Sequence, residues 1–370
     1  MTLYLVMTER CNFKCTYCYE GNEKPSDRMS LETARTAINQ AVRNLSKDED
    51  LRISLFGGEP LLEFALIKEI VEYAVDMSKK HDFRLSFATT INGSLMNDEI
   101  ADFFITNKVG VMLSLDGTRE AHDINRVTVN NEPTFDSILL NIDNFMRLQR
   151  ESSIEVRMTV TRNNIGSLSS GLKGIYNLGF KNIGFELVQN DVWTSSDVNV
   201  LNNELEDIAS FYYDELKQLS GLNISTIDRR IEQFIKPKDR IYCGAGTAFY
   251  AVGPNGDLYL CPRLMDEQLV AGHVNDGIPN FGQKCLMLDA DKHDCNGCKY
   301  QSFCVPCLAV NYWNNGTFHQ EVPMYCQYKK AVVSFSRIIA DKLYENERAI
   351  FNEKYLYKRV SREMVSENVC

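Results

Sequence analysis

Three cysteines near the start of the chain have a spacing suited to iron–sulfur chemistry. Cys11, Cys15 and Cys18 form a CX3CX2C pattern on one short stretch. Three thiolates placed this way can ligate three irons of a 4Fe–4S cluster, which leaves the fourth iron open to bind a substrate or cofactor directly. Zinc is the alternative, but structural zinc sites usually have four ligands in paired CX2C form, and no histidine precedes residue 81. We therefore expect a 4Fe–4S site with one open iron.

A second group of cysteines lies in the last third of the chain. Between residues 243 and 326 the sequence holds Cys243, Cys261, Cys285, Cys295, Cys298, Cys304, Cys307 and Cys326, and Cys370 is the last residue. Disulfides are rare in a reducing compartment, whereas clustered cysteines are typical of metal or iron–sulfur ligation. Zinc ribbons are the alternative for paired CX2C spacings. The clustering predicts metal-stabilised structure in this region.

Composition limits the possible functions. A chain of 370 residues is long enough for two or three structural units. The net charge of -10 and the sequence pI near 5.2 argue against a general nucleic-acid binder, because backbone phosphates require a basic surface. No signal peptide and no apolar run of membrane-spanning length is recognisable. We expect a soluble, cytoplasmic protein without a nucleic-acid or membrane partner.

The first half of the chain alternates between strand-like and helix-like segments. The strand-like segments, rich in Val, Ile, Leu and Phe, are residues 3–8, 51–56, 84–90, 109–115, 154–161 and 182–188. Helical patterns lie between them at residues 30–45, 63–79, 97–107, 135–148 and 167–178, the first with Ser30 as its expected N-cap. Six alternations predict an α/β fold with a parallel sheet and crossover helices. Because a complete barrel has eight units, we expect a partial (β/α)6 TIM-like barrel.

Distinctive motifs follow several of these predicted strands. The cysteine loop directly follows the first predicted strand. The second strand is followed by Gly57, Gly58 and Glu59, the third by Asn92, and the end of the fourth carries Ser114 and Asp116. Ligands of such folds sit at the carboxyl ends of the strands. We therefore expect all these residues to lie on one rim of the barrel.

The composition changes along the second half of the chain. Residues 191–240 have a helical pattern and are interpreted as a bridge after a barrel of residues 1–190. Residues 241–328 are rich in Cys, Gly and Pro and have few long periodic segments, so a small fold there needs metal ligation. Residues 329–370 begin with another helical pattern.

The CX3CX2C loop after a first strand resembles the signature of the radical S-adenosylmethionine superfamily. The resemblance implies that the open iron chelates the amino and carboxylate groups of S-adenosylmethionine. Reductive cleavage then gives a 5′-deoxyadenosyl radical that abstracts hydrogen from an unactivated C–H bond. Tyr17 matches the aromatic position against adenine, and Gly57, Gly58 and Glu59 resemble the motif that contacts the methionine amino group. Asn92 and Ser114 would bind ribose hydroxyls or the carboxylate, and Arg157 would pair with the carboxylate or form a structural ion pair.

The later cysteines resemble the SPASM domain, which carries two auxiliary 4Fe–4S clusters. The seven-cysteine order matches, except that Cys304 and Cys307 are one residue closer together than usual. The resemblance implies three clusters in total, one that binds S-adenosylmethionine and two auxiliary. Carried over, the ligands of the first auxiliary cluster would be Cys243, Cys261 and Cys307, with Cys285 as a fourth ligand or an open site for a substrate thiolate. Those of the second would be Cys295, Cys298, Cys304 and Cys326.

Enzymes of this group mostly act on peptides or proteins, which leaves several reactions in competition. They are thioether formation between Cys sulfur and carbon, as in sactipeptide and ranthipeptide maturation, oxidation of Cys or Ser to formylglycine in sulfatases, and carbon–carbon crosslinking. Sulfatase maturases carry a catalytic aspartate directly after the cysteine equivalent to Cys261, where this chain has Pro262. Because proline cannot accept a proton, we favour thioether formation on a ribosomal peptide.

Partners and further alternatives follow from the same resemblance. We expect a Cys-rich peptide substrate with a leader and an external electron donor such as flavodoxin or ferredoxin. Because the chain begins at the first predicted strand, we expect the leader to be bound by a separate protein, by the barrel–SPASM surface, or not at all. A small-molecule radical dehydrogenase and a non-catalytic iron–sulfur electron carrier are the alternatives. A carrier needs no cofactor pocket, which argues against it.

Overall fold

A computed structural model describes residues 1–21, 27–188, 193–237, 243–278, 294–295 and 297–357 of the chain. Within these residues ten strands form one sheet, in the order β10-β9-β8-β1-β2-β3-β4-β5-β6-β7. The strands are β1 (Thr2–Thr8), β2 (Leu51–Gly57), β3 (Leu85–Ile91), β4 (Val109–Ser114), β5 (Ile154–Val160), β6 (Asn182–Leu187), β7 (Asn223–Ile224), β8 (Phe249–Val252), β9 (Asp257–Tyr259) and β10 (Gly272–His273).

Strands β1 to β6 are the six that the sequence predicts. They are parallel and lie side by side in chain order, which confirms the α/β fold and the parallel sheet. β7 continues the sheet in parallel next to β6. At the other edge β8 pairs in parallel with β1, and β9 and β10 follow as antiparallel strands. The cysteine-rich region thus adds strands directly to the sheet of the barrel, and the limits of the four predicted units remain predictions.

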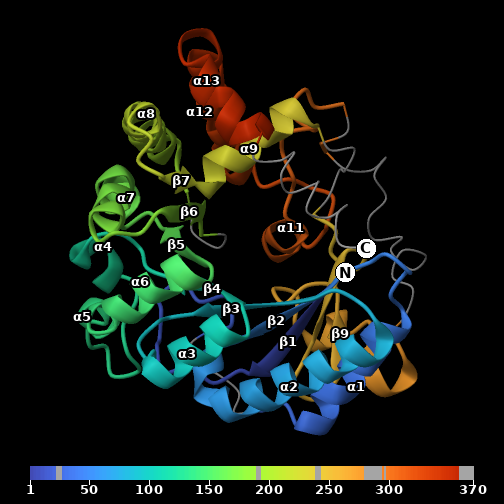
Figure 1. The fold of residues 1–370 in the computed structure, drawn as a ribbon. Helices are drawn as coiled ribbons and strands as arrows, with labels where there is room; N and C mark the ends of the chain where they lie inside the picture. Colours follow the sequence, from blue (N-terminus) through green and yellow to red (C-terminus); the bar gives the residue numbers. More distant parts are fainter. Residues whose placement is uncertain (22–26, 189–192, 238–242, 279–293, 296, 358–370) are drawn as a thin grey trace.

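Helices cover the outer face of this sheet (Figure 1). Those between consecutive strands of the barrel are α1 (Leu31–Arg43), α2 (Phe64–His81), α3 (Asp98–Thr106), α4 (Arg119–Asp123), α5 (Phe135–Leu139), α6 (Ile142–Glu151) and α7 (Leu168–Asn177). Ser30 caps α1 as predicted, because its hydroxyl accepts from the Thr33 backbone N–H at 3.0 Å. The single helix expected over residues 135–148 is wrong. The chain makes α5 and α6 with a turn between them, where Leu140 is 85% exposed and does not belong to an apolar helix face.

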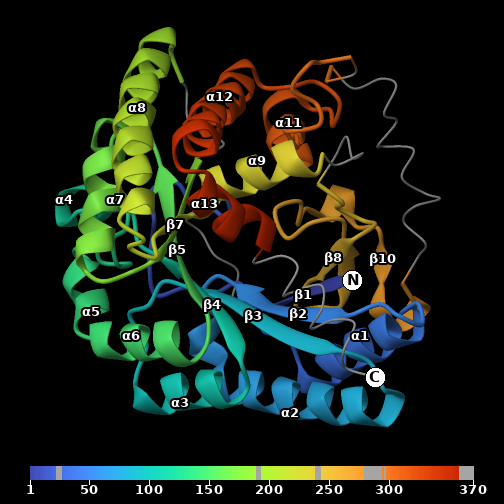
Figure 2. The same ribbon diagram turned by 45° about the horizontal axis from the view of Figure 1, so that its top comes forward.

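The later helices extend the helical layer from α7 onward (Figure 2). They are α8 (Ser195–Lys217), α9 (Ser225–Ile235), α11 (Leu308–Asn315), α12 (Pro323–Asn346) and α13 (Arg348–Phe351). α8 lies beside α7, while α9 packs against β6. α12 packs against both α8 and α9, and so ties the end of the described chain to the bridge that follows the barrel. No helix in the described residues is long and apolar enough to cross a membrane.

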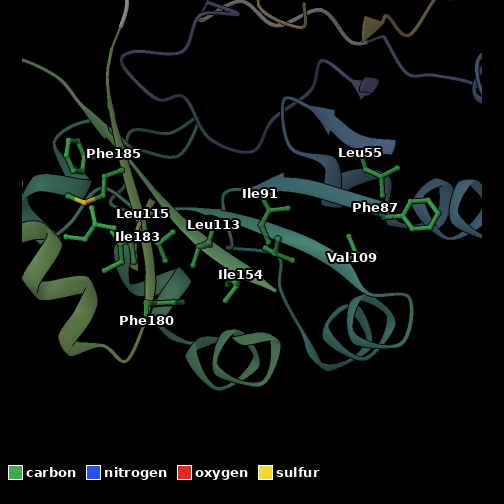
Figure 3. Close-up of a cluster of buried hydrophobic side chains, with 14 of the residues drawn as sticks. Leu55, Phe87, Ile91, Val109, Leu113, Leu115, Ile154, Phe180, Ile183 and Phe185 are labelled. Atoms are coloured by element: carbon green, nitrogen blue, oxygen red, sulfur yellow. The ribbon is translucent and has the colours of Figure 1, made fainter. Parts of the chain in front are cut away.

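The core is built from the strands and from the inner faces of the helices. Figure 3 shows buried side chains that follow β3 to β6, among them Ile91, Leu113, Ile154 and Phe185. Side chains on parallel strands that helices cover are removed from contact with water. Each large aliphatic side chain buried in this way contributes about 1.5–3 kcal/mol of transfer free energy. This rigid sheet fixes where the loops at the carboxyl ends of its strands begin.

Candidate functional site

A cavity of about 390 Å³ lies at the carboxyl ends of the barrel strands. It is lined by every site residue predicted in the barrel, namely Cys11, Cys15, Cys18, Tyr17, Gly57, Gly58, Glu59, Asn92, Ser114 and Arg157. These residues come from the loop after β1, from the ends of β2 to β4 and from the middle of β5. The expectation that the motifs share one rim is therefore met by their positions.

Two glycines allow β2 to end directly against the cysteine loop. Gly57 has φ +140°, and a Cβ there would lie 2.2 Å from the Thr8 carbonyl oxygen. A Cβ on Gly58 would lie 2.4 Å from the Arg10 carbonyl oxygen. The Gly58 N–H donates to Thr8 O at 2.9 Å, and the Glu59 N–H donates to Arg10 O at 2.9 Å. The close approach that glycine permits is thus between the two chain segments that form the cavity wall.

Glu59 connects the ends of neighbouring strands. Its carboxylate is fully buried and accepts from the Leu61 N–H at 3.1 Å and from the Asn92 N–H at 2.7 Å. The Asn92 side chain donates to Asn12 Oδ1 at 2.8 Å, and its own Oδ1 accepts from Ser94. Glu59 therefore holds Asn92, and Asn92 holds the cysteine loop, in addition to any contact that either makes with a ligand.

Tyr17 belongs to a buried network that sequence reasoning only partly found. Its hydroxyl donates to Asp116 Oδ2 at 2.5 Å, and the Arg126 guanidinium lies 5.2 Å from its ring centre. Arg126 donates twice to Asp116, at 2.8 and 3.1 Å, and both side chains are nearly inaccessible to solvent. Burial is the main cause that raises the pKa of Tyr17, so the phenol stays neutral. Arg126 gave no signal in the sequence, because nothing in its spacing from Asp116 indicates that the two side chains pair.

The opposite side of the cavity carries a second group of charges. Arg157 donates to Glu155 at 3.0 Å, while its Nε is buried and has no hydrogen-bond partner. Glu186 on β6 accepts from Lys329 at 2.6 Å and from the Tyr325 hydroxyl at 2.9 Å, both on α12. Burial alone would raise the pKa of Glu186, but Lys329 and the hydrogen bonds lower it to about 2. The sequence gave no reason to connect Glu186 with α12.

The chemistry of these donors fits the predicted cofactor pair. The buried Arg157 Nε is an unused donor that a carboxylate can satisfy. In the described part of the chain, no three His, Cys, Asp or Glu side chains are close enough to hold one metal ion. The cavity beside the three loop cysteines has room for a ligand, and three thiols in a CX3CX2C loop are a donor set that suits an iron–sulfur cluster.

The later cysteines divide into two groups. Burial is the main cause that raises the pKa of Cys261 to about 12, with contributions from Cys307 and Cys243. Burial also raises the pKa of Cys295, with contributions from Glu321 and then from Cys304, Cys298 and Cys326. No described cysteine forms a disulfide with another described residue. Cys285 and Cys370 lie outside the described residues.

Comparisons with known proteins were made for the whole chain. The family model described as the radical SAM superfamily matches residues 5–164. An uncharacterized protein of Methanocaldococcus jannaschii is 30% identical over 282 residues, which cover 74% of this chain and 88% of that protein. A cysteine-type anaerobic sulfatase-maturating enzyme of Clostridium novyi is 28% identical over 293 residues, covering 73% of this chain and 75% of the enzyme. The solved structure of native anSMEcpe with bound AdoMet and Kp18Cys peptide has the same fold, with a TM-score of 0.77 at 19% identity over 93% of this chain and 99% of that one.

Proposed function

The chain belongs to the radical SAM superfamily, and we propose that this enzyme joins the sulfur of a peptide cysteine to a carbon of a second residue. A peptide as substrate is supported by the relatives, since the Clostridium novyi enzyme matures sulfatases and the similar solved structure holds a peptide. Thioether formation removes one hydrogen from the thiol and one from carbon, so the product is two hydrogens lighter. S-adenosylmethionine and a reduced 4Fe–4S cluster, held by the cysteine loop, would supply the radical that takes the hydrogen atom from carbon. The thiol proton would leave to solvent, and the remaining electron would pass to an oxidised auxiliary iron–sulfur cluster.

The residues of the barrel cavity would bind and orient this cofactor. Cys11, Cys15 and Cys18 would ligate the cluster, and the Arg157 Nε would receive a carboxylate of S-adenosylmethionine. The remaining predicted contacts, from Tyr17, Gly57, Gly58, Glu59, Asn92 and Ser114, line the same space. Because Glu186 is held ionised by Lys329, it is a fixed negative charge and not a proton carrier at neutral pH.

The observation that carries the thioether proposal is the three-thiol group next to Pro262. Cys307 contributes to the raised pKa of both Cys243 and Cys261, and Cys243 contributes to that of Cys261, so the three thiols lie near one another. A cluster held there by three thiolates would keep an iron free to bind the substrate sulfur. The residue after Cys261 is Pro262, which cannot act as a base. We assign Cys295, Cys298, Cys304 and Cys326 to a second auxiliary cluster, because they also cluster together.

Formylglycine formation is the second candidate. It is favoured by the 28% identity to the Clostridium novyi maturase over three quarters of each chain. In that reaction a cysteine loses its sulfur as hydrogen sulfide after oxidation and hydrolysis, and the product is an aldehyde. The two reactions therefore leave products that differ in sulfur content and in reactivity.

The experiment is anaerobic co-expression with a short Cys-containing peptide encoded beside this gene, followed by alkylation and intact-mass measurement. Loss of two hydrogens with a cysteine that resists alkylation would establish the thioether. Loss of sulfur with a new hydrazide-reactive aldehyde would establish formylglycine instead. Cys11→Ala should leave the peptide unmodified, and a modified peptide with that variant would contradict the cofactor assignment.

A further inference from the structure

One residue from the cysteine-rich region reaches the cofactor cavity. Arg263 follows Pro262 shortly after β9 and lines the same cavity as the cysteine loop. All other described residues that line this cavity lie between residues 11 and 188. Arg263 therefore faces the cofactor site from the part of the molecule that carries the proposed auxiliary clusters.

The charge of Arg263 is not matched by a carboxylate in the described structure. Three arginines line the cavity, and two of them have acidic partners: Arg126 pairs with Asp116 at 2.8 Å, and Arg157 pairs with Glu155 at 3.0 Å. No described carboxylate forms an ion pair with Arg263, whose main ionisable neighbours are Cys307, Tyr19, Tyr325 and Cys261. A guanidinium keeps its charge at all accessible pH values. Arg263 is only partly exposed, and no described carboxylate pairs with it, so a bound anion would offset the cost of desolvating its charge.

Two of the three carboxylates that line the cavity, those of Glu59 and Glu186, already have hydrogen-bond or ion-pair partners. Glu59 accepts from two backbone N–H groups, and Glu186 pairs with Lys329. Neither has to turn toward Arg263 to find a partner. Among the described lining residues, Arg263 is thus an arginine without a carboxylate partner, and it lies on the side of the cavity formed by the later part of the chain.

Contacts on both sides of Arg263 hold it in place. Its backbone carbonyl accepts from the Trp313 indole N–H of α11 at 2.7 Å, and its backbone N–H donates to Cys261 Sγ at 3.5 Å. The guanidinium lies 5.9 Å from the centre of the Tyr19 ring, in the loop that also holds Cys18. A positioned guanidinium loses little conformational entropy when it binds an anion, and its fork of N–H donors matches a carboxylate.

We propose that Arg263 binds a carboxylate of the substrate, either an Asp or Glu side chain near the reacting cysteine or the free carboxyl terminus of the peptide. The proposal rests on the proposed function in one respect, since it takes the substrate to be a peptide. It adds the chemical class that the cavity selects, which is an acidic peptide. Arg157 offers its own unused donor for the cofactor carboxylate, so Arg263 is not needed for that role.

The test uses the reconstituted holoenzyme with S-adenosylmethionine and no reductant, so that binding is measured without turnover. The probes are N-acetylated pentapeptide amides with a central cysteine and either Asp or Asn beside it, and the Asn peptide with a free carboxyl terminus. The wild type should bind one of the two acidic probes about tenfold or more tightly than the neutral amide by calorimetry. The acidic probe that binds tightly identifies the source of the carboxylate.

Variants at position 263 give the decisive comparison. Arg263→Gln should remove the preference, and Arg263→Lys should keep part of it, because the charge remains while the fork is lost. Arg263→Glu should favour a probe with Lys beside the cysteine. Arg84→Gln is the control, since Arg84 is an exposed arginine that pairs with Asp50.

Three results would overturn the proposal. The first is equal affinity of the wild type for acidic and neutral probes. The second is a preference for the acidic probe that survives in Arg263→Gln. The third is a change of S-adenosylmethionine affinity or of cluster reduction potential in Arg263→Gln while the peptide preference stays intact. The last result would make Arg263 a counter-ion of the cofactors. If acidic probes bind as expected but no peptide is modified under reductant, the carboxylate site stands and the proposed function fails.

Discussion

Replacing Gly58 by alanine tests the packing between β2 and the cysteine loop. An added Cβ would lie 2.4 Å from Arg10 O, 2.7 Å from Glu9 O and 2.8 Å from the Arg10 carbonyl carbon. All three atoms are backbone, so no side-chain rotation relieves the overlap. Arg10 directly precedes Cys11, and any movement of Arg10 therefore moves the first predicted cluster ligand.

The magnitude follows from the distances. Ordinary van der Waals contact begins near 3.4 Å, so the Arg10 carbonyl has to move by about 1 Å. Such a shift breaks the Glu59 N–H to Arg10 O bond and weakens the Gly58 N–H to Thr8 O bond, both 2.9 Å long. Two hydrogen bonds and the residual strain together cost about 2–4 kcal/mol of the free energy of unfolding. A displacement of about 1 Å at a cofactor ligand should also lower 5′-deoxyadenosine formation by about tenfold or more.

The assay compares Gly58→Ala with Gly174→Ala. Gly174 lies in α7, where an added Cβ would meet Thr118 Cγ2 at an ordinary 3.7 Å. Alanine is more favourable than glycine in a helix by about 0.5–1 kcal/mol, so this control should be as stable as the wild type or more stable. Urea denaturation of the apoprotein gives the stability, and iron content and 5′-deoxyadenosine rate of the reconstituted protein give the effect on the site. Wild-type stability, iron content and rate in Gly58→Ala would refute the reasoning.

Three further predictions concern the buried groups of the cavity wall. Glu59→Gln should lower the free energy of unfolding by about 1–3 kcal/mol, because one of the N–H groups of Leu61 and Asn92 loses its acceptor, and urea denaturation should detect the loss. Asp116→Asn should cost about 3–5 kcal/mol by the same measurement, since it leaves the buried Arg126 charge unpaired, and a cost below about 1 kcal/mol would contradict that view. Burial lowers the pKa of His122 to about 4, so the unfolded chain binds a proton below pH 6.5 that the folded protein refuses. Stability should therefore fall as pH decreases from 6.5 toward 4, with a slope from this group of up to about 1.4 kcal/mol per pH unit, and His122→Gln should flatten the profile measured between pH 5 and 6.5.

The local features of the barrel could be predicted because short-range patterns determine them. The apolar segments from residues 3–8 to 182–188 correspond to β1 to β6, each within two residues at either end. The rule that ligand sites follow parallel strands then placed the cysteine loop, Gly57 to Glu59, Asn92 and Ser114 around one cavity. The error at residues 135–148 has a local cause as well, since Leu140 supplied an apolar position that is exposed in the structure.

Features that depend on distant parts of the chain could not be predicted. β8, β9 and β10 have between two and four residues each, too few for a periodic pattern, and β8 joins the sheet by pairing with β1. Glu186 and Lys329 are 143 residues apart. Asp116 and Arg126 are separated by only 10 positions, but no periodic pattern or motif indicates that they pair. Such charge pairs are set by tertiary packing, which neither spacing nor composition records.

The shared sheet explains how the later part of the chain can influence the cofactor site. β8 pairs in parallel with β1 in the same sheet. The centres of the Phe249 ring of β8 and the Tyr4 ring of β1 are 5.7 Å apart. Cys243 and Cys261 flank the β8–β9 hairpin, so this edge of the sheet positions them relative to the strand that leads into Cys11. The residues just after Cys261 are Pro262 and Arg263, and Arg263 enters the cavity. A substitution in this short segment can therefore change what the cavity binds while the cofactor wall, built from β1 to β6, stays intact.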